Sequence, residues 1–377
     1  MEKHLHIVSF DVPFPPDYGG IIPIFSLIKN LHQEGIVLHL HCFEYGRGHQ
    51  PELNKYCKEV KYYERREGIK GFSFRLPYIV SSRVNAKLRA ELLKDDFPIL
   101  FEGIHCSYLL LDEAFANRKT GLRLHNVEFA YYMQLFRTSS DFLKRWYYYF
   151  ESKLLKRYEA RIARNCKIIT MSAEDAVVYN RQLKAISTIY MPMIIPFTEI
   201  KTKPGTGQYC LYHGNLSVSE NEKAASWLIT DVFNKLDIPL VIAGKHPGER
   251  LKKLSASNAN VQLVADPSDE EMFELIQDAQ INVLPSFNST GVKLKLLNAL
   301  FNGRHCVVNA AMGCGTEMVF LFDVADDGME FRTLIRNLFN EAFSEEEIGT
   351  RKEVLFKIFD NVTNTRSLVQ WIYSHYQ

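Results

Sequence analysis

The stretch from Ile281 to Thr316 restricts the fold of this chain more than any other part of the sequence. An apolar run over Ile281–Pro285 is followed by a polar segment, Ser286–Thr290, and a helical pattern then runs from Gly291 to Leu300. A second apolar run begins at Cys306. This order predicts a strand, a loop, a helix and another strand, which is the repeating unit of a parallel α/β sheet.

The start of the predicted helix has the features of an anion site. Ser289 or Thr290 can cap the helix, and Gly291 lets a ligand approach the backbone closely. The first N–H groups lie at the positive end of the helix dipole and favour a bound anion. Lys293 and Lys295 add positive charge nearby. The pattern therefore predicts a site for a phosphate group.

Asn298 follows Thr290 by eight residues, just over two helical turns, so we expect the two side chains to point in roughly the same direction. The stretch resembles the donor-binding signature of retaining glycosyltransferases of family 4, which have the GT-B fold. The family pattern Gly-x-Lys-x-Lys-x-x-Glu-Ala has Glu where this chain has Asn298, and many members have another Glu in place of Thr290. The resemblance implies a nucleotide-sugar site.

Length and composition set the broad class. A chain of 377 residues is long enough for two domains, and 46% hydrophobic with 24% charged residues is usual for a globular protein. A net charge of +1 gives no general attraction to nucleic acid. The seven cysteines show no Cys-x-x-Cys pair, which predicts reduced thiols. Without a membrane-length apolar run or a signal-peptide pattern, we expect a cytoplasmic protein.

The chain opens with a unit of the same α/β type. A strand is predicted over Leu5–Phe10, a helix over Ile21–Gln33 and a strand over Val37–Cys42, as in a doubly wound sheet. The first loop lacks the Gly-x-Gly-x-x-Gly fingerprint, so no classical dinucleotide site is predicted. Its Gly19–Gly20 pair resembles the first loop of family 4 enzymes, where donor sugar and acceptor come close to the backbone. A simple turn is the alternative.

Two later strands, expected over 98–101 and 121–124, run directly into polar residues. Since the carboxyl ends of parallel strands face the ligand crevice, we expect these side chains to collect there. The His-Asn-Val-Glu run at His125 resembles a family feature and implies that this histidine lies near the transferred sugar; a structural histidine is the alternative. The polar residues concerned are Glu102, His105, His125, Asn126 and Glu128.

A long helix is predicted from Phe136 to Asn165, rich in aromatic and basic residues. Such a composition can form a face that lies on a membrane surface. Alternatively, Leu154, Leu155, Tyr158 and Ile162 pack on the sheet while the Lys and Arg side chains stay in solvent. We favour packing, because interleaved glutamates dilute the basic face.

A Pro- and Gly-rich segment over 191–207 is predicted to link two domains. The predicted domains are a Rossmann-like acceptor domain over 1–190 and a Rossmann-like donor domain over 205–360. By the resemblance, a terminal helix over 361–377 crosses back to the first domain. Three strand ends of the second half match the family's order: Gly214–Asn215 near the diphosphate, Lys245 as a phosphate partner, and Val264 meeting the base through its backbone.

The resemblance implies an α/β protein of the GT-B class, with two parallel sheets facing each other across a cleft. It implies transfer of a hexose, with retention and without a metal, from a UDP- or GDP-sugar to a polysaccharide, lipid-linked or other glycan acceptor. The implied catalytic residues are His125 and Thr290. The implied donor-binding residues are Gly20, Gly214, Asn215, Lys245, Val264, Ser289, Gly291, Lys293, Lys295 and Asn298.

Two other functions stay open. With neither glutamate present, the chain could be a catalytically impaired GT-B protein that binds a sugar nucleotide, or a partner enzyme, in a surface-polysaccharide pathway. A sugar-nucleotide epimerase on the same fold fits less well, because the second half offers few carboxylates at its strand ends. We expect a cytoplasmic location, with weak association at the inner face of the membrane as a further option.

Overall fold

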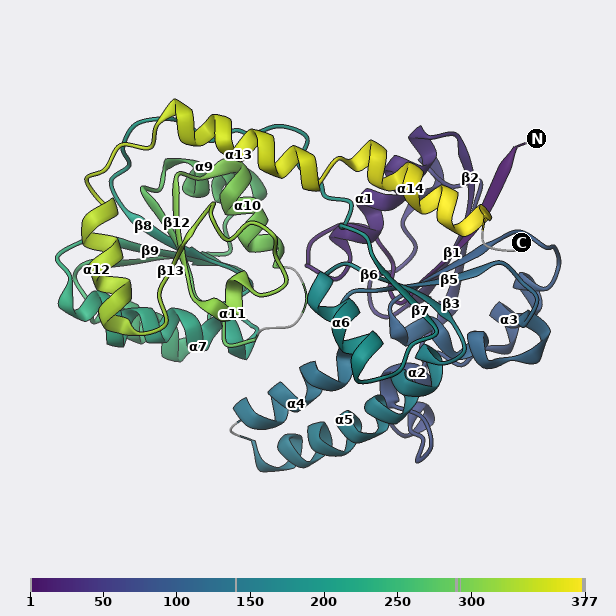
Figure 1. Cartoon of the computed structure of the whole chain (residues 1–377). Coiled ribbons are helices and arrows are strands. Elements are labelled where there is room, and N and C mark those ends of the chain that lie inside the picture. The colour runs from purple at the N-terminus through teal and green to yellow at the C-terminus, as the bar shows by residue number, and fades with distance from the viewer. Residues whose placement is uncertain (1, 140, 289–290, 292, 375–377) are drawn as a thin grey trace. The chain divides into compact units, whose positions relative to one another are not determined.

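The computed structural model describes residues 2–139, 141–288, 291 and 293–374, and it folds into two compact units (Figure 1). Unit 1 holds the chain up to Pro196 and again from Phe359 onward. Unit 2 holds most of the chain between Phe197 and Ile358. Each unit is a parallel sheet covered by helices, so the prediction of two Rossmann-like halves is confirmed.

The sheet of unit 1, as described, has seven strands in the order β3-β2-β1-β4-β5-β6-β7. Each pairing is parallel, and the central strands are buried on both faces, which explains their Leu, Ile and Val residues. The strands are β1 (Lys3–Ser9), β2 (Ile36–Glu44), β3 (Glu59–Glu64), β4 (Ile99–Glu102), β5 (Thr120–Leu124), β6 (Lys167–Thr170) and β7 (Ser187–Tyr190). The helices are α1 (Ile22–Gln33), α2 (Tyr78–Ser81), α3 (Ala86–Leu92), α4 (Glu128–Thr138), α5 (Phe142–Ala163), α6 (Ala173–Arg181) and α14 (Asn361–Ser374).

Unit 2 has a six-stranded parallel sheet in the order β10-β9-β8-β11-β12-β13, counted over the described residues. Its strands are β8 (Cys210–His213), β9 (Leu240–Gly244), β10 (Val261–Ala265), β11 (Ile281–Leu284), β12 (His305–Val308) and β13 (Asp323–Val324). Its helices are α7 (Ser219–Trp227), α8 (Glu249–Ala256), α9 (Asp269–Asp278), α10 (Leu294–Asn302), α11 (Ala310–Gly313), α12 (Gly328–Leu338) and α13 (Glu345–Ile358).

In each sheet the strand order reverses once. The reversal lies between β1 and β4 in unit 1, and between β8 and β11 in unit 2. The loops that leave the carboxyl ends of such a strand pair turn to opposite faces of the sheet and leave a crevice between them. These two points are therefore the candidate ligand crevices of the two units.

The C-terminal helix α14 packs on the sheet of unit 1. The ring of Trp371 lies so close to Gly121 of β5 that a Cβ atom there would stand 2.5 Å from Cζ3 of the indole. The Tyr373 hydroxyl donates to the backbone oxygen of His4, and Arg366 pairs with Glu34 at 2.7 Å. The helix thereby covers apolar surface that belongs to strands more than 200 residues earlier in the chain.

The single helix predicted over 136–165 is wrong. The structure has two helices, because α4 ends at Thr138 and Asp141 starts a new one. Ser139 is extended, and the Asp141 carboxylate accepts from the backbone N–H of Lys144 at 3.1 Å. Ser and Asp side chains compete for backbone partners in this way and favour helix starts over helix interiors.

The prediction that glutamates dilute the basic face of this region is also wrong. Glu151 and Glu159 are buried, with 4% and 0% of their surfaces exposed. Glu151 accepts from the backbone N–H of Tyr78 at 2.8 Å, and Glu159 from that of Phe129 at 2.7 Å. The predicted burial of Leu155, Tyr158 and Ile162 is confirmed, whereas Leu154 is only half-buried.

The predicted start of α10 is wrong as well. The helix begins at Leu294, and its N-cap residue is Lys293, whose side chain makes no capping bond. Gly291 has φ +66°, a left-handed conformation that cannot belong to a right-handed helix, so the first turn forms only after it. Ser289 and Thr290 lie outside the described residues. The predicted alignment of Thr290 with Asn298 therefore involves a residue outside the described part of the chain.

None of the helices among the described residues is long and apolar enough to cross a membrane.

We predict that Gly121→Ala destabilises unit 1 by about 1–3 kcal/mol, because the new methyl group would overlap the Trp371 ring. Gly349→Ala is the matched control: nothing lies within 4 Å of its Cβ position in α13, so this change should be neutral or stabilise by up to about 1 kcal/mol. Urea unfolding measures both. Equal unfolding midpoints for the two variants would contradict the packing of α14 on β5.

Candidate functional site

The loops after β8 and β9 approach each other closely in unit 2. A Cβ atom on Gly244 would lie 1.8 Å from the backbone oxygen of Gly214, so only glycine fits there. The backbone N–H of Leu216 donates to the oxygen of Lys245 at 2.9 Å. Gly214, Asn215 and Lys245, all predicted from sequence as site residues, thus sit on two joined loops at the carboxyl edge of the sheet.

The loop after β8 is held by its own side chains. The Asn215 carboxamide oxygen accepts from the backbone N–H of Ser217 at 3.1 Å and from its hydroxyl at 2.7 Å. Asn221, at the start of α7, donates to the backbone oxygen of Asn215 at 2.9 Å. The side chains of Asn215 and Lys245 are exposed at this edge, which leaves Lys245 free to meet an anion.

Lys295 reaches from α10 to the end of β8. Its ammonium lies 3.3 Å from the Tyr212 hydroxyl and 3.0 Å from the Asn221 carboxamide oxygen, and 5.0 Å from the centre of the Tyr212 ring. Burial lowers the pKa of Lys295 to about 8; Glu220 opposes that change and Lys293 adds to it. The structure gives this cation neutral hydrogen-bond acceptors, and an added anion would compensate it.

Sequence reasoning missed the partners of Lys295. Tyr212 and Asn221 are 83 and 74 residues away in the chain, and no motif links them to it. It also missed His213, a buried histidine directly before Gly214 whose Nε2 has no hydrogen-bond partner among the described residues. Burial, with Lys295 nearby, lowers the pKa of His213 to about 3, so the ring is neutral.

The remaining predicted donor-binding residues belong to α10, to β10 and to the segment before α10. Lys293 is the N-cap residue of α10, and Asn298 lies in that helix, where its carboxamide oxygen accepts from Asn302 at 2.7 Å. Val264 is half-buried near the end of β10. Gly291 lies in the segment before α10, and the predictions for Ser289 and Thr290 fall outside the described residues.

In unit 1 a buried ion cluster holds His125. Glu102, at the end of β4, is fully buried and accepts from Arg123 Nε at 2.8 Å and from His125 Nε2 at 2.9 Å. Burial alone would raise the pKa of Glu102, but Arg123 and His125 together bring it below its ordinary value. Glu102 is therefore a carboxylate that fixes the orientation of the imidazole.

His125 is a neutral ring with a defined free nitrogen. Burial lowers the pKa of His125, and the neighbouring Glu102 only partly offsets this. Because Nε2 donates its proton to Glu102, Nδ1 is left as a hydrogen-bond acceptor. The Phe10 ring packs edge-on against His125 at 5.6 Å and also lies against Gly20, where a Cβ atom would stand 3.2 Å from it. The Phe10 ring therefore contacts both Gly20 and His125.

Three other polar residues predicted at these strand ends have different surroundings. The imidazole of His105 stacks on Phe10 at 4.8 Å. Asn126 donates to Glu128 at 3.4 Å, and burial raises the pKa of Glu128 to about 7. Burial likewise raises the pKa of Glu159 to about 8. The nearby Glu128 contributes to the raised pKa of Glu159.

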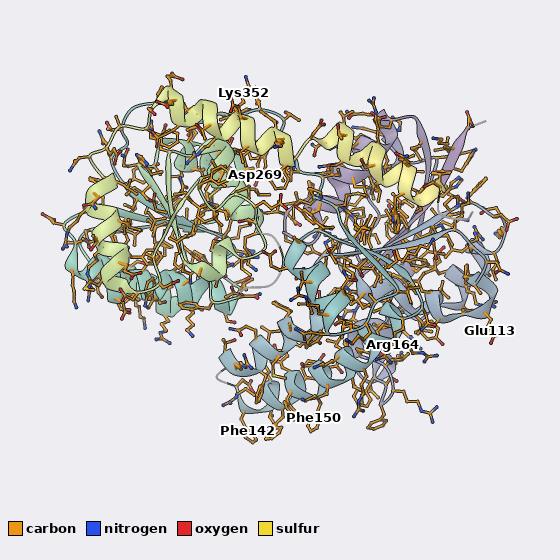
Figure 2. The ribbon with its side chains drawn as sticks, viewed as in Figure 1. Glu113, Phe142, Phe150, Arg164, Asp269 and Lys352 are labelled. Carbon is orange, nitrogen blue, oxygen red and sulfur yellow. The ribbon has the colours of Figure 1, made fainter. Side chains whose placement is uncertain are left out.

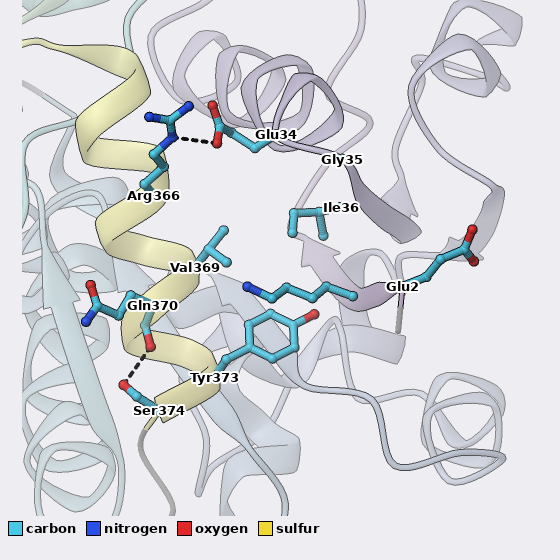
Figure 3. Close-up of a pocket in the computed structure, with 10 residues that line it drawn as sticks. Glu2, Glu34, Gly35, Ile36, Arg366, Val369, Gln370, Tyr373 and Ser374 are labelled. Carbon is cyan, nitrogen blue, oxygen red and sulfur yellow. Dashed lines mark hydrogen bonds and ion pairs between the residues drawn. The ribbon is translucent and has the colours of Figure 1, made fainter.

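Two further features bear on ligands. In the part of the chain that the structure describes, no three His, Cys, Asp or Glu side chains are grouped to hold a metal ion. A groove of about 640 Å³ lies between α14 and the first residues of β1 and β2, beside the Arg366–Glu34 ion pair (Figure 3). Because it borders the amino ends of the strands, it lies at the edge of the sheet opposite the crevice.

We predict that Glu102→Gln destabilises unit 1 by about 3–5 kcal/mol, since it leaves the buried Arg123 cation without its carboxylate. The double variant Glu102→Gln/Arg123→Met should lose less stability than Glu102→Gln alone. Asp112→Asn is the control, because its partner Arg89 is exposed and exposed ion pairs contribute little to stability. Urea unfolding at neutral pH measures all three. A loss for Glu102→Gln no larger than that of the control would contradict the cluster's role.

Comparisons with known proteins agree with this architecture. Residues 207–341 match the model of the family described as glycosyl transferases group 1. An uncharacterised 44.6 kDa protein in the cps region of Klebsiella pneumoniae is 28% identical over 376 residues, covering 94% of each chain. A glycosyltransferase from Rickettsia africae has a TM-score of 0.66 at 14% identity, with full coverage of both chains.

Two more solved structures have the same fold. TarM of S. aureus, in a complex that includes UDP, has a TM-score of 0.67 at 10% identity. HepE of Anabaena, in complex with UDP and glucose, has a TM-score of 0.64 at 12% identity. Each covers 99% of this chain and 100% of the other. Membership of the retaining family 4 in particular stays a prediction. The chain has the GT-B fold and resembles the group 1 glycosyltransferases, which confirms the resemblance predicted from its sequence.

Proposed function

We propose that this protein transfers a hexose from a nucleotide-diphosphate sugar to a glycan or lipid-linked acceptor, with retention of configuration and without a metal ion. The family match over residues 207–341 and the GT-B fold support glycosyl transfer from a nucleotide sugar. The relative from a cps region supports a place in surface-polysaccharide synthesis. Retention rests on the resemblance of the stretch around α10 to the family 4 signature.

The observation that carries the proposal is the position of Lys295. This ammonium lies at the switch point of unit 2, beside the end of β8, with neutral oxygens at 3.0 and 3.3 Å. A partly desolvated cation at the carboxyl edge of a Rossmann-like sheet is matched to an anionic group. The diphosphate of a nucleotide sugar supplies that charge and leaves with more of it when the sugar is transferred.

The other residues of unit 2 take supporting roles in this proposal. Lys245 and Lys293 add charge around the diphosphate, and the Gly214–Asn215 loop lets it approach the backbone. Val264 meets the base through its backbone, and Asn298 takes the place of the family's ribose-binding Glu. In unit 1, Nδ1 of His125 accepts a hydrogen bond from a sugar hydroxyl, and Glu102 keeps the ring in the tautomer that can do so.

Calorimetric titration with UDP, GDP and their sugar conjugates, followed by an assay for release of the nucleoside diphosphate, tests the proposal. We expect binding of one nucleotide class, and slow release of diphosphate that speeds up with a suitable acceptor. Absence of binding by every nucleotide and conjugate would reject it.

A second candidate is a non-catalytic GT-B protein that binds a sugar nucleotide or a partner enzyme. Asn298 favours it, because an uncharged amide, already accepting a hydrogen bond from Asn302, replaces the family's glutamate. Tight nucleotide binding without release of diphosphate on a broad panel of acceptors would favour this candidate. The two candidates share the nucleotide site and differ in turnover.

We predict that affinity for a nucleotide sugar is constant below about pH 8 and falls above it, by up to about tenfold per pH unit. The pKa of Lys295 in the free protein is about 8, and a bound diphosphate raises it. Binding above pH 8 must therefore take up a proton, and the ligand's own diphosphate diester has none to lose in this range. Calorimetry at several pH values measures the slope.

Lys295→Met should weaken binding at pH 7 by about tenfold or more and abolish the slope. Lys295→Arg should keep binding strong to higher pH, because its guanidinium stays charged. Lys352→Met, an exposed change on α13, is the control. An unchanged slope in Lys295→Met would assign the pH dependence to another group.

We predict that Asn298→Glu tightens binding of the donor by about 1 kcal/mol, the difference between a neutral and a charge-assisted hydrogen bond. A carboxylate near a diphosphate repels it, but Lys295 lies one turn earlier on the same helix and screens the repulsion. Asn298→Gln has similar length without charge and is the control. Equal or weaker binding of the Glu variant, with the fold intact, would point to a site rebuilt for another ligand.

A further inference from the structure

The first half of α5 exposes an apolar stripe that nothing in the described chain covers. Phe142, Trp146 and Phe150 follow each other at intervals of four residues and therefore lie along one side of the helix. They are 68%, 45% and 60% exposed, and the neighbouring Leu143 is 79% exposed. Phe142 and Phe150 project from α5 into solvent (Figure 2). Such large side chains are costly to leave in water.

The second half of the same side is cationic. At about 100° per residue, Lys153 and Arg157 fall within about 20° of Phe142 and Trp146, eleven residues earlier. The exposed cations of this side are Lys153, Arg157, Arg161 and Arg164. We call these four residues, with Phe142, Leu143, Trp146 and Phe150, the outer face of α5.

The acidic residues of this region do not balance that charge. Between residues 128 and 165 there are four carboxylates, and Glu128, Glu151 and Glu159 are buried. The fourth, Asp141, is used as the N-cap of α5. Burial raises the pKa of Glu151 to about 7, which reduces its negative charge further. The surface is therefore more basic than the sequence suggests.

A second exposed segment that combines apolar and basic side chains is connected to α5 through a hydrogen bond of α2. Ile69 and Phe74 are 94% and 87% exposed, next to the exposed cations Lys70 and Arg75. The segment leads into α2, whose first backbone N–H, that of Tyr78, donates to Glu151 of α5 at 2.8 Å. Both apolar groups thus belong to connected elements of unit 1.

We propose that the outer face of α5, together with the segment from Ile69 to Arg75, binds the surface of an anionic lipid bilayer. Bulky apolar side chains beside exposed Lys and Arg are suited to the interface, where the rings enter the headgroup region and the cations meet phosphates. A second copy of this chain is the poorer occupant, since a symmetric contact would offer the cations of this outer face no carboxylate from its counterpart. The inference does not depend on the transfer reaction, because lipid binding needs no sugar substrate.

Co-sedimentation of the full-length protein with phosphatidylcholine vesicles, with or without phosphatidylglycerol, tests the proposal. We expect binding to the vesicles that contain phosphatidylglycerol, and weakening of that binding by added salt. Phe142→Ser/Leu143→Ser and Lys153→Glu/Arg157→Glu should each reduce the bound fraction about tenfold or more. These side chains are exposed, so circular dichroism should show an unchanged fold.

Matched controls are Val319→Ser/Phe320→Ser, an exposed apolar pair of unit 2, and Lys253→Glu/Lys352→Glu, two exposed lysines. Both should bind vesicles as the unmodified protein does. The proposal is overturned if the protein does not sediment with anionic vesicles, or if the α5 and control variants lose binding equally. Light scattering that shows a dimer, dissociated by the α5 variants and without vesicle binding, would overturn it in favour of a second copy.

Discussion

Parallel pairing of the strands is the constraint on which the rest of this structure depends. A parallel strand cannot return through a tight turn, so each one needs a crossover, and these crossovers cover both faces of the sheet. All carboxyl ends then meet at one edge. Because the order reverses once in each unit, at β1/β4 and at β8/β11, the backbone itself opens a crevice at those points.

The buried charge in the crevice of unit 1 has a partner of opposite charge, whereas the buried charge in that of unit 2 has neutral hydrogen-bond partners. In unit 1 the carboxylate of Glu102 is compensated internally by Arg123, and the result is a fixed, neutral His125. In unit 2 the ammonium of Lys295 has hydroxyl and carboxamide partners, and its lowered pKa reflects the cost of that environment. An internally balanced cluster positions a side chain, whereas a cation whose hydrogen-bond partners are neutral attracts an anion.

In helix α5, burial of the glutamates makes the exposed surface more basic than the sequence indicates. Its sequence places two Glu among six Lys and Arg, and this interleaving predicted a diluted basic face. In the fold, Glu151 accepts from α2 and Glu159 from the Phe129 backbone and the Tyr179 hydroxyl. A carboxylate has acceptor sites that these inward N–H and O–H groups fill, while Lys and Arg extend their long stems to water. The exposed surface is therefore left basic and aromatic.

The sequence by itself determined the two α/β halves, their order and the polar residues at the strand ends. Apolar runs, glycines and helical periodicity are local signals, and they sufficed to place Gly214, Lys245 and His125 at carboxyl ends. Tertiary structure alone decided that Gly291 delays the start of α10, that residues 128–163 form two helices, and that Lys295 reaches Tyr212 and Asn221. It also decided that Arg123 points inward to Glu102. The reason is physical: which side chains are desolvated, and by which partners, depends on contacts between residues far apart in the chain, and local patterns carry no record of them.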